Sequence, residues 1–209
     1  MTLGVVAAVV GVGLYGLVLA PSPDAASPTI DPTTPVSAPD VPTPSPSGST
    51  LRAILSTADG ERFARDAADA LMTWDTTAFE MTDYAQVIVD AGDPSGYETA
   101  ALASDVRTYY PTADAWAQLR TYGTRQWLTI DGVFVPASWD DALSQAAEGD
   151  LLAGTIAYTI SGTRHRAGVV GTDAQETSRP IAFTLFIACE PSFDECHLLR
   201  LSEVDNPLR

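Results

Sequence analysis

Apolar residues recur at helical spacing along residues 61–76, and we expect the rest of the chain to pack around this stretch. Five of them fall at i, i+4, i+7, i+8 and i+11, on one stripe of an α-helix: Phe63, Ala67, Ala70, Leu71 and Trp74. Charged residues occupy the opposite side. The pattern predicts an amphipathic helix, capped by Ser56 or Thr57 and running to about Trp74, that lies across a sheet and closes one side of its core.

Three shorter helical patterns follow before residue 120. The first starts near Thr82 and stops at Gly92 and Pro94, the second starts with a capping-box sequence at residues 95–98, and Thr112 caps the third. The large side chains expected to point inward are Tyr84, Val87, Ile88, Leu102, Val106, Trp116 and Leu119. The first half of the domain is therefore predicted to be helical.

The second half of the domain alternates with the period of β-strands. Residues 127–130 and 133–135 flank Asp131-Gly132, a dipeptide typical of a two-residue hairpin turn. Residues 138–147 indicate a helical insertion, and alternation returns at 155–163, at 181–187 and around Leu199 and Leu201. Helices followed by four or five antiparallel strands indicate an α+β roll, with the N-terminal helices packed on a curved antiparallel sheet.

The first fifty residues differ in composition from this domain. Residues 2–20 are apolar or small without a charge, which is long enough to cross a bilayer. Pro21 directly after Ala20, and the lack of a basic segment before the apolar run, favour an uncleaved membrane helix over a cleaved signal peptide. Residues 21–50 hold nine Pro and eleven Ser or Thr, which is typical of an extended stalk. The predicted organisation is a transmembrane helix at 1–20, a disordered stalk at 21–57, and the α+β domain at 58–209, outside the cytoplasm of a cell membrane.

The charge balance excludes one class of partner. Eleven arginines, no lysine and 27 acidic residues give a formal net charge of −16. A field of that sign repels phosphate backbones, so we expect no direct nucleic-acid binding. The two histidines and two cysteines do not have metal-ligand spacing, and we expect neither a metal nor another cofactor.

Cys189 and Cys196 lie between the last two predicted strands, and outside the cell we expect them to form a disulfide. If the two cysteines faced each other in an unbroken register, Leu185 would pair with Arg200, which puts an arginine on an apolar face. The hydrophobic pattern instead places Leu185 near Leu199 or Leu201. We therefore expect the disulfide to close an irregular or bulged loop.

The order of these features resembles a known family. The motifs of the single roll that carry the resemblance are FARDAADALMTWDT, VPASW, SGTRHRAGV, FTLFIAC and CHLLRLSEVDNPLR. Together with the N-terminal span and the Pro-rich stalk, they are similar to actinobacterial conjugative-element proteins of the TcpC type and to the bitopic assembly-factor subunit of type IV secretion systems. The resemblance covers about residues 58–209 and implies a nuclear-transport-factor-2-like (cystatin-like) fold. It also implies an oligomer-forming subunit of a DNA-transfer channel with no catalytic residues to carry over. The TcpC type carries two such rolls, whereas this chain has one.

The same roll also hosts enzymes, which use an Asp or His as base and a Tyr or Asp as donor inside a cone-shaped pocket. The candidates for such roles are Asp75, Asp83, Tyr84, Tyr109, Tyr110 and His165. The two aspartates fall at predicted helix ends, where a cap or a solvated acid is the ordinary role. His165 is expected to be a hydrogen-bonded or exposed group, on the strand face opposite its two arginine neighbours.

Arg164 and Arg166 share one face of a predicted strand and form the local basic concentration of an acidic domain. They represent either a solvated strand end that pairs with nearby carboxylates or a contact with an acidic partner surface. Tyr109, Tyr110 and Trp116 are further candidates for partner contact as an exposed aromatic patch, with core packing as the alternative for Trp116.

These features favour a non-catalytic bitopic membrane subunit that assembles a conjugative machine with other subunits and with copies of itself. The alternatives are a small-ligand-binding or enzymatic roll, and an accessory membrane protein of a lipid-import system. A deep polar cavity lined by Asp75, Tyr84 or Tyr110 would favour the enzyme. A packed interior with aromatic and arginine residues on a flat surface would favour assembly.

Overall fold

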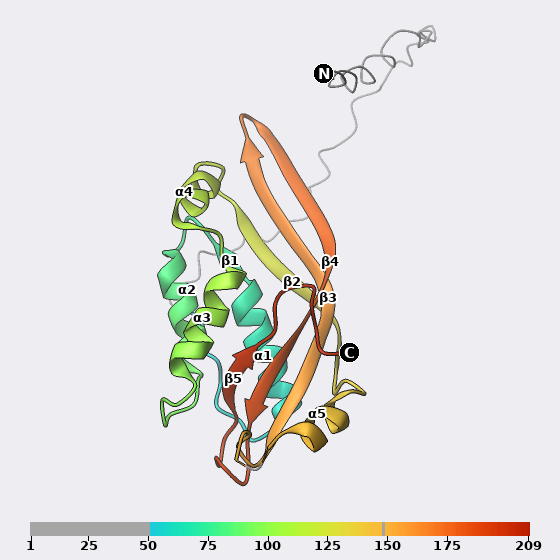
Figure 1. Cartoon of the computed structure of the whole chain (residues 1–209). Coiled ribbons are helices and arrows are strands. Elements are labelled where there is room, and N and C mark those ends of the chain that lie inside the picture. Colours follow the sequence, from blue (N-terminus) through green and yellow to red (C-terminus); the bar gives the residue numbers. More distant parts are fainter. Residues whose placement is uncertain (1–50, 148) are drawn as a thin grey trace, which may run out of the picture. The chain divides into compact units, whose positions relative to one another are not determined.

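The computed structural model describes residues 51–147 and 149–209. The predicted membrane helix at 1–20 and residues 21–50 of the predicted stalk lie outside these residues. Within the described part of the chain, no helix is long and apolar enough to cross a membrane. The described residues form an α+β domain in which one five-stranded antiparallel sheet, in the order β1-β2-β3-β4-β5, curls around a layer of helices (Figure 1).

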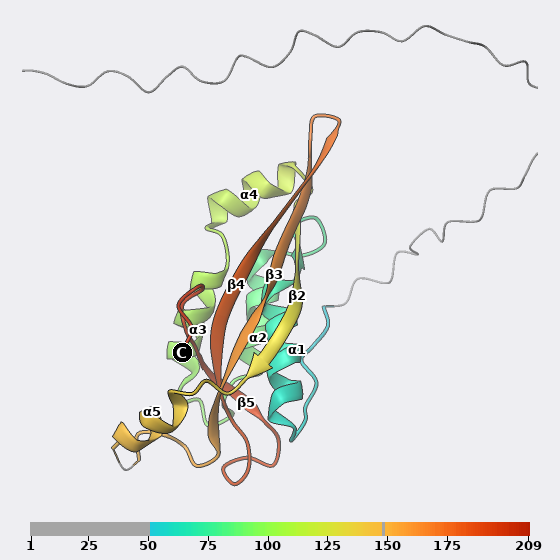
Figure 2. The same ribbon diagram turned by 90° about the vertical axis from the view of Figure 1, so that its right-hand side faces the viewer.

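The main helices lie on one side of the sheet. α1 (Gly60–Met72) packs across β2, β3 and β4, whereas α2 (Met81–Asp90) and α3 (Thr99–Tyr109) pack against α1 and against each other. α3 also contacts β5, and Figure 2 shows these helices behind the sheet when it is viewed from its other side. The predicted order, helices first and strands after, is confirmed except for one two-residue strand between α1 and α2.

The first helix carries the predicted apolar stripe but differs at both ends. Asp59 caps it by accepting a hydrogen bond from the Arg62 N–H at 3.1 Å, so the cap is neither Ser56 nor Thr57. The helix ends at Met72, because Trp74 is extended and begins β1 (Trp74–Asp75), which pairs with β2 (Arg125–Phe134). The Trp74 ring still enters the core while its backbone joins the sheet.

The three other helices predicted before residue 120 are confirmed, and α3 differs at its start. α4 (Ala113–Thr121) starts as predicted, because Thr112 Oγ1 accepts a hydrogen bond from the Ala115 N–H at 3.3 Å. The capping box predicted at 95–98 does not form, because the Ser95 N–H donates to the Asp93 carboxylate at 2.7 Å in a turn that precedes α3. The inward residues of α3 are buried as predicted.

The hairpin predicted at Asp131-Gly132 is wrong. β2 runs through both residues as one strand and pairs with β3 (Thr155–Val170), with a register shift between Ile130 and Gly132. The shift makes Asp131 the extra residue of a bulge, so that Ile130 before it and Val133 after it both pack on the core. The dipeptide therefore serves a bulge rather than a turn.

β3 and β4 (Asp173–Ala188) form a hairpin that is much longer than the predicted alternating segments. They pair from Thr155 with Ala188 to Val170 with Asp173, and Gly171, at a φ of 67°, supplies a left-handed residue to the turn. We call residues 164–179 the arm; its outer half extends past α4 in Figure 1. Within the described residues, the outer edge of β4 in the arm pairs with no other strand.

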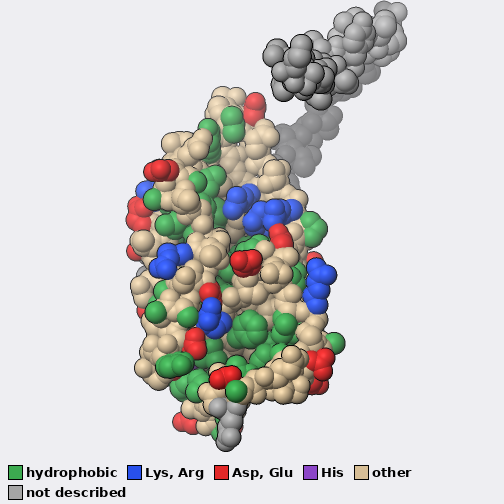
Figure 3. Space-filling view, in the orientation of Figure 1, with side chains coloured by type: hydrophobic (Ala, Val, Ile, Leu, Met, Phe, Trp, Pro, Cys, Tyr) green, Lys and Arg blue, Asp and Glu red, His purple; other side chains and the backbone are tan. Residues whose placement is uncertain are grey.

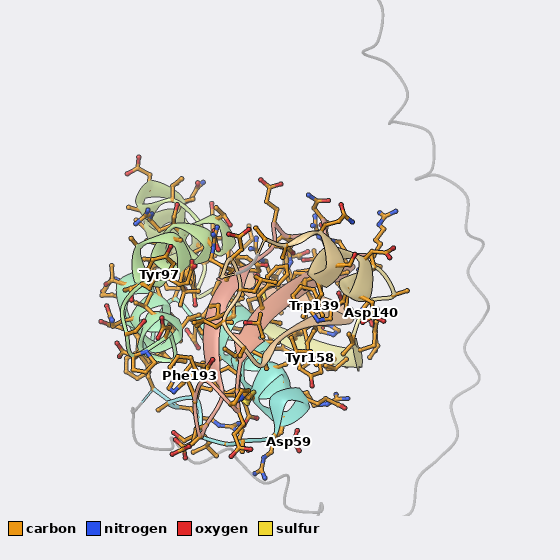
Figure 4. All side chains as sticks on the ribbon, turned by 60° about the horizontal axis from the view of Figure 1, so that its bottom comes forward. Asp59, Tyr97, Trp139, Asp140, Tyr158 and Phe193 are labelled. Atoms are coloured by element: carbon orange, nitrogen blue, oxygen red, sulfur yellow. A yellow bond between two sulfur atoms is a disulfide. The ribbon has the colours of Figure 1, made fainter. Side chains whose placement is uncertain are left out.

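The sheet is buried on both faces near the base of the domain. Ile160 and Phe183 are fully buried on the helix-facing side. The other side is covered by α5 (Trp139–Gln145), whose Trp139 lies over Phe186 with ring centroids 5.9 Å apart (Figure 4). The C-terminal segment covers the same side, where the Leu208 N–H donates to Thr184 Oγ1 at 2.9 Å.

β5 (His197–Leu201) pairs with the C-terminal part of β4, and Cys189 and Cys196 form the predicted disulfide. Leu185 pairs with Leu201, as the hydrophobic pattern predicts. The irregularity is a register shift between Phe186 and Ile187, inside the strand pair, whereas the prediction placed it in the loop. Because of this register shift, Leu185 can pair with Leu201 while Cys189 and Cys196 still lie close enough to form the disulfide.

Residues 51–57, placed in the stalk by composition, pack against the domain. Leu51 and Ile54 contact the core, and Arg52 forms an ion pair with Asp66 at 3.5 Å. The Thr57 carbonyl accepts a hydrogen bond from the N–H of one disulfide cysteine at 2.8 Å. The disulfide loop therefore also fixes the segment that leads into α1.

Candidate functional site: an arginine cluster on the arm

Three arginines lie together on the helix-facing side of the arm. Alternate residues of a strand share a face, so Arg164 and Arg166 point to the same side as Ile160, which is buried under the helices. Arg164 pairs directly with Arg179 of β4, which brings a third guanidinium to this face. Arginine side chains gather over the lower part of the arm in Figure 3. We call these three residues the arginine cluster.

Arg166 is held by two contacts. Its Nε donates to Gln126 Oε1 at 2.8 Å, and its guanidinium carbon lies 5.3 Å from the ring centroid of Trp74. Gln126 is itself buried and donates from Nε2 to the Met72 carbonyl at 2.8 Å. The end of α1, β1 and β2 therefore position Arg166. Its two Nη groups have no acceptor among the residues that the structure describes.

Arg164 makes no ion pair and no side-chain hydrogen bond within residues 51–147 and 149–209. Burial lowers the pKa of Arg164 below its ordinary value, and the charges of Arg166 and Arg179 lower it further. Burial also lowers the pKa of Arg166, with a smaller contribution from Arg179. The cluster thus holds guanidiniums that are partly desolvated and repel one another, an arrangement that costs free energy unless an anion is present.

One carboxylate of the chain reaches the cluster. Asp205 forms an ion pair with Arg179. Its φ of 63° lets its N–H donate to the Ala182 carbonyl at 2.8 Å while its carboxylate also faces β4. Three guanidiniums and one carboxylate leave a local charge of about +2 at their ordinary protonation states, in a chain of formal net charge −16.

Aromatic side chains lie beneath Arg166. The ring centroid of Trp116 is 5.0 Å from that of Trp74 and 6.0 Å from that of Tyr84. The indole N–H groups of Trp74 and Trp116 and the hydroxyl of Tyr110 are buried without a partner among the described residues. Burial raises the pKa of Tyr110, so it stays a neutral donor. The interior beside the cluster is therefore rich in unpaired hydrogen-bond donors.

The aromatic residues predicted to form an exposed patch lie in the core. Tyr109, Tyr110 and Trp116 are 7%, 8% and 3% exposed. Tyr109 packs edge-on against Phe183, and its hydroxyl donates to the Ser202 carbonyl at 2.7 Å. For Trp116, core packing is the arrangement found, because α4 turns it onto the neighbouring tryptophan. Among the residues predicted for partner contact, the arginines of the arm are the ones within reach of solvent.

His165 lies on the opposite face of β3 from the cluster, as predicted. Its ring stacks on Trp127 with centroids 5.0 Å apart and planes 7° from parallel. Its Nε2 lies 3.1 Å from Thr129 Oγ1 and its Nδ1 lies 2.8 Å from Ser178 Oγ. Hydroxyl groups thus engage both ring nitrogens, which supports the prediction of a hydrogen-bonded histidine over that of a general base.

The other candidate acids and phenols serve local structure. Tyr84 OH donates to the Asp75 carbonyl at 3.1 Å and accepts from the Asp75 N–H at 2.9 Å. The Asp75 carboxylate accepts from the N–H and the hydroxyl of Thr77 at 2.8 and 2.6 Å, and Asp83 accepts from the Glu80 N–H at 3.0 Å at the start of α2. A surface depression of about 490 Å³ lies beside Asp75 and Tyr84. The polar groups of Asp75 and Tyr84 beside it are therefore already bonded to the protein.

Two further features of the molecule bear on metal or ligand binding. Within the described residues, no group of three or more His, Cys, Asp or Glu is placed to hold a metal. A pocket of about 340 Å³ lies at the other end of the sheet, with Phe186 and Leu199 in its lining and Tyr97, 85% exposed, beside it (Figure 4). It contains no cluster of unpaired polar groups comparable to that at the arm.

Sequence reasoning missed Arg179, Gln126 and Asp205 as members of the site. A signal for Arg179 was present, because the alternation through Ile187 and Ile181 continues by one step to Arg179. The contacts of Gln126 and Asp205 depend on pairing between distant segments, which no local pattern records. Comparison with protein-family models, curated proteins and solved structures found no match.

Proposed function

We propose that this chain is a non-catalytic, single-pass membrane subunit that helps to assemble a conjugative, type IV secretion-like DNA-transfer machine. In this proposal residues 58–209 adopt a nuclear-transport-factor-2-like roll outside the cytoplasm, where the roll contacts other subunits and copies of itself. The curled antiparallel sheet with helices on its inner side is compatible with that roll. The sequence motifs that resemble TcpC-type proteins support the assembly role.

The observation that carries the proposal is the filled interior of the curled sheet. An enzyme of this architecture needs a cavity between helices and sheet to hold its substrate. Here Trp74 and Trp116 occupy that space, and both are almost fully buried. The nearby Tyr84 and Tyr109 bond to backbone groups, whereas Arg164 of the arm, which is partly buried, forms no ion pair within the described residues. This distribution favours a binding surface over a catalytic pocket.

The disulfide supports a position outside the cytoplasm. A bridge between Cys189 and Cys196 persists in oxidising compartments and is rare in the cytosol. Fusion of alkaline phosphatase after Arg209 tests this position, because that enzyme becomes active only after export. We expect an active fusion. A stable but inactive fusion would place the domain in the cytoplasm and contradict the proposal.

Crosslinking in cells that transfer DNA tests the assembly role. A photoreactive amino acid replaces Val170, which is 55% exposed at the tip of the arm, and a matched control replaces Leu143 of α5, which is 42% exposed. We expect crosslinks from the arm to other membrane subunits or to a second copy. Deletion of the gene should lower DNA transfer, and the full chain should restore it. Normal transfer after deletion, together with no crosslink at either position, would refute the assembly role.

A further inference from the structure

The arm has a free sheet edge beside its arginine cluster. Backbone groups of an antiparallel strand point alternately to its two sides, and the bond from Asp205 to the Ala182 carbonyl shows that even-numbered residues of β4 point outward. Further along the same edge the outward residues are Ala174, Glu176 and Ser178. Residues 173–180 are exposed, and no strand of the described chain covers this edge. The arm can therefore accept one more strand.

The C-terminal segment shows how this edge receives an extended chain. The Ser202 N–H donates to the Thr184 carbonyl at 2.9 Å, and three residues later Asp205 donates to the Ala182 carbonyl at 2.8 Å. From that position the Asp205 carboxylate reaches Arg179. An acidic segment laid along the edge of β4 thus delivers a carboxylate to the arginine cluster.

The other two guanidiniums are open to the same kind of contact. Arg164 and the Nη groups of Arg166 have no acceptor among the described residues. Glu176, on the edge itself, does not neutralise them, because its side chain lies on the opposite face, 4.0 Å from His165. Residues two apart on a strand are separated by about 7 Å, which is also the spacing of carboxylates two residues apart in an extended peptide.

We propose that Arg164 and Arg166, beside the Arg179–Asp205 ion pair, bind the carboxylates of an acidic segment of a partner protein, which lies as an extended strand along β4 at residues 174–178. The inference rests on the proposed function only in taking the ligand to be part of a protein. Bidentate arginine–carboxylate contacts would supply the specificity, and backbone hydrogen bonds would supply the register. The acidic field of the whole chain repels long polyanions, which favours a short segment with matched carboxylates over nucleic acid.

Binding is measured with the full chain in a neutral detergent, using a fluorescent eight-residue peptide in which Asp alternates with Thr. We expect this peptide to bind and its Asn-for-Asp counterpart not to bind. Arg164→Gln combined with Arg166→Gln should weaken binding by about tenfold or more, because charge-assisted contacts are lost. Arg107→Gln, which removes an exposed arginine from α3, should change it by less than about twofold. The double variant should remain folded, because it relieves repulsion among guanidiniums.

A second measurement locates the peptide. Amide hydrogen exchange at Glu176 and Ser178 should slow when the Asp peptide is bound, and unchanged exchange there would overturn the placement on the edge. Equal binding of the Asp and Asn peptides, or of the double variant and the unmodified chain, would overturn the arginine assignment. Displacement of the peptide by inorganic phosphate or citrate at the peptide's own concentration would indicate a small-anion site and overturn the peptide proposal. Peptide binding combined with normal DNA transfer after deletion and no crosslink at either position would refute the assembly role alone.

Discussion

Replacing Trp74 with Ala removes the side chain that fills the space between helices and sheet. The ring joins three parts of the domain, because it follows the end of α1, belongs to β1 and lies under an arginine of the arm. If the interior is a packed core, the substitution should unfold the domain more easily. If the interior is instead a ligand pocket, the substitution should enlarge it at little cost.

Three contributions set the expected loss in the free energy of unfolding. Truncation of a buried aromatic side chain costs about 3 to 5 kcal/mol, and Trp74 is 2% exposed. That loss includes contacts with Trp116 at 5.0 Å and Arg166 at 5.3 Å, aromatic and cation–π interactions of about 1 kcal/mol each. The buried indole N–H acts in the opposite direction, because it lacks an acceptor. We expect Trp74→Ala to cost about 4 kcal/mol and Trp74→Phe, which also removes that N–H, about 1 kcal/mol.

Urea unfolding of the full chain in a neutral detergent, followed by far-ultraviolet circular dichroism, measures these differences without depending on tryptophan fluorescence. Trp127→Ala is the matched control, because Trp127 is half-buried on the other face of the sheet and stacks on His165. Its loss should cost about 1 kcal/mol. A cooperative Trp74→Ala variant within about 1 kcal/mol of the unmodified chain would refute the packed-core reasoning.

Three further perturbations test other features of the fold. Removal of the disulfide by Cys189→Ala with Cys196→Ala should lower the free energy of unfolding by about 2.5 kcal/mol, the loop-closure entropy for cysteines 7 residues apart. A reductant should lower the urea midpoint of the unmodified chain and leave that of the double variant unchanged. Equal midpoints for the unmodified chain and the double variant would contradict this prediction. Burial raises the pKa of Tyr109 in the folded state above its value of about 10 in the unfolded chain. The stability that the neutral Tyr109 contributes is therefore fully present below about pH 10 and is lost as the pH rises above about 10. Because the chain has no lysine, the change in melting temperature from pH 8 to 11.5 reports mainly on tyrosines. Tyr109→Phe should make the fall in melting temperature with rising pH less steep, and an equally steep fall would oppose this assignment. Asp59→Ala should lower the free energy of unfolding by about 1 kcal/mol because the cap of α1 is lost, and Ser56→Ala should change it very little. Urea midpoints measure both effects. A larger loss for Ser56→Ala than for Asp59→Ala would favour the cap expected from the sequence.

The helical half was predictable because its signals are local. Apolar spacing places the buried stripe of α1 correctly, and Thr112 caps α4 as its position suggests. The end of α1 was not predictable in this way, because Trp74 continues the helical spacing. Its backbone leaves the helix to pair with Gln126, about fifty residues later, and such a distant partner leaves no mark in the local pattern.

The bulge in β2 shows how one dipeptide can serve two structures. Asp131-Gly132 suits a tight turn as well as a bulge, and the choice depends on what lies beside it. Here β3 supplies Gly162, where an added Cβ would lie 2.4 Å from the Thr129 carbonyl oxygen. The close approach of the two backbones needs a glycine at that position, and it holds β2 in the sheet past Asp131. The sequence contains Gly162 but does not show that it lies against Thr129 and Ile130.

The arginine cluster was half predictable for the same reason. Alternation establishes that Arg164 and Arg166 share a face, but the identity of that face depends on register. The pairing of Ile160 with Phe183 places both arginines on the core side, and it brings Arg179 beside them. Neither the aromatic layer under the cluster nor the Asp205 ion pair follows from any local pattern.

The position of the cluster along β3 bears on what the arm is for. On its helix-facing side the strand carries apolar residues as far as the helices cover it, and then Arg164 and Arg166. Two partly buried guanidiniums that form no ion pair within the described residues lower the stability of the free domain, and apolar or neutral polar residues there would avoid that cost. A domain that needed only a stable sheet would gain from such a replacement. The cost falls on strand residues that lie beside a free edge in the described part of the chain, which is where an incoming acidic strand would remove it.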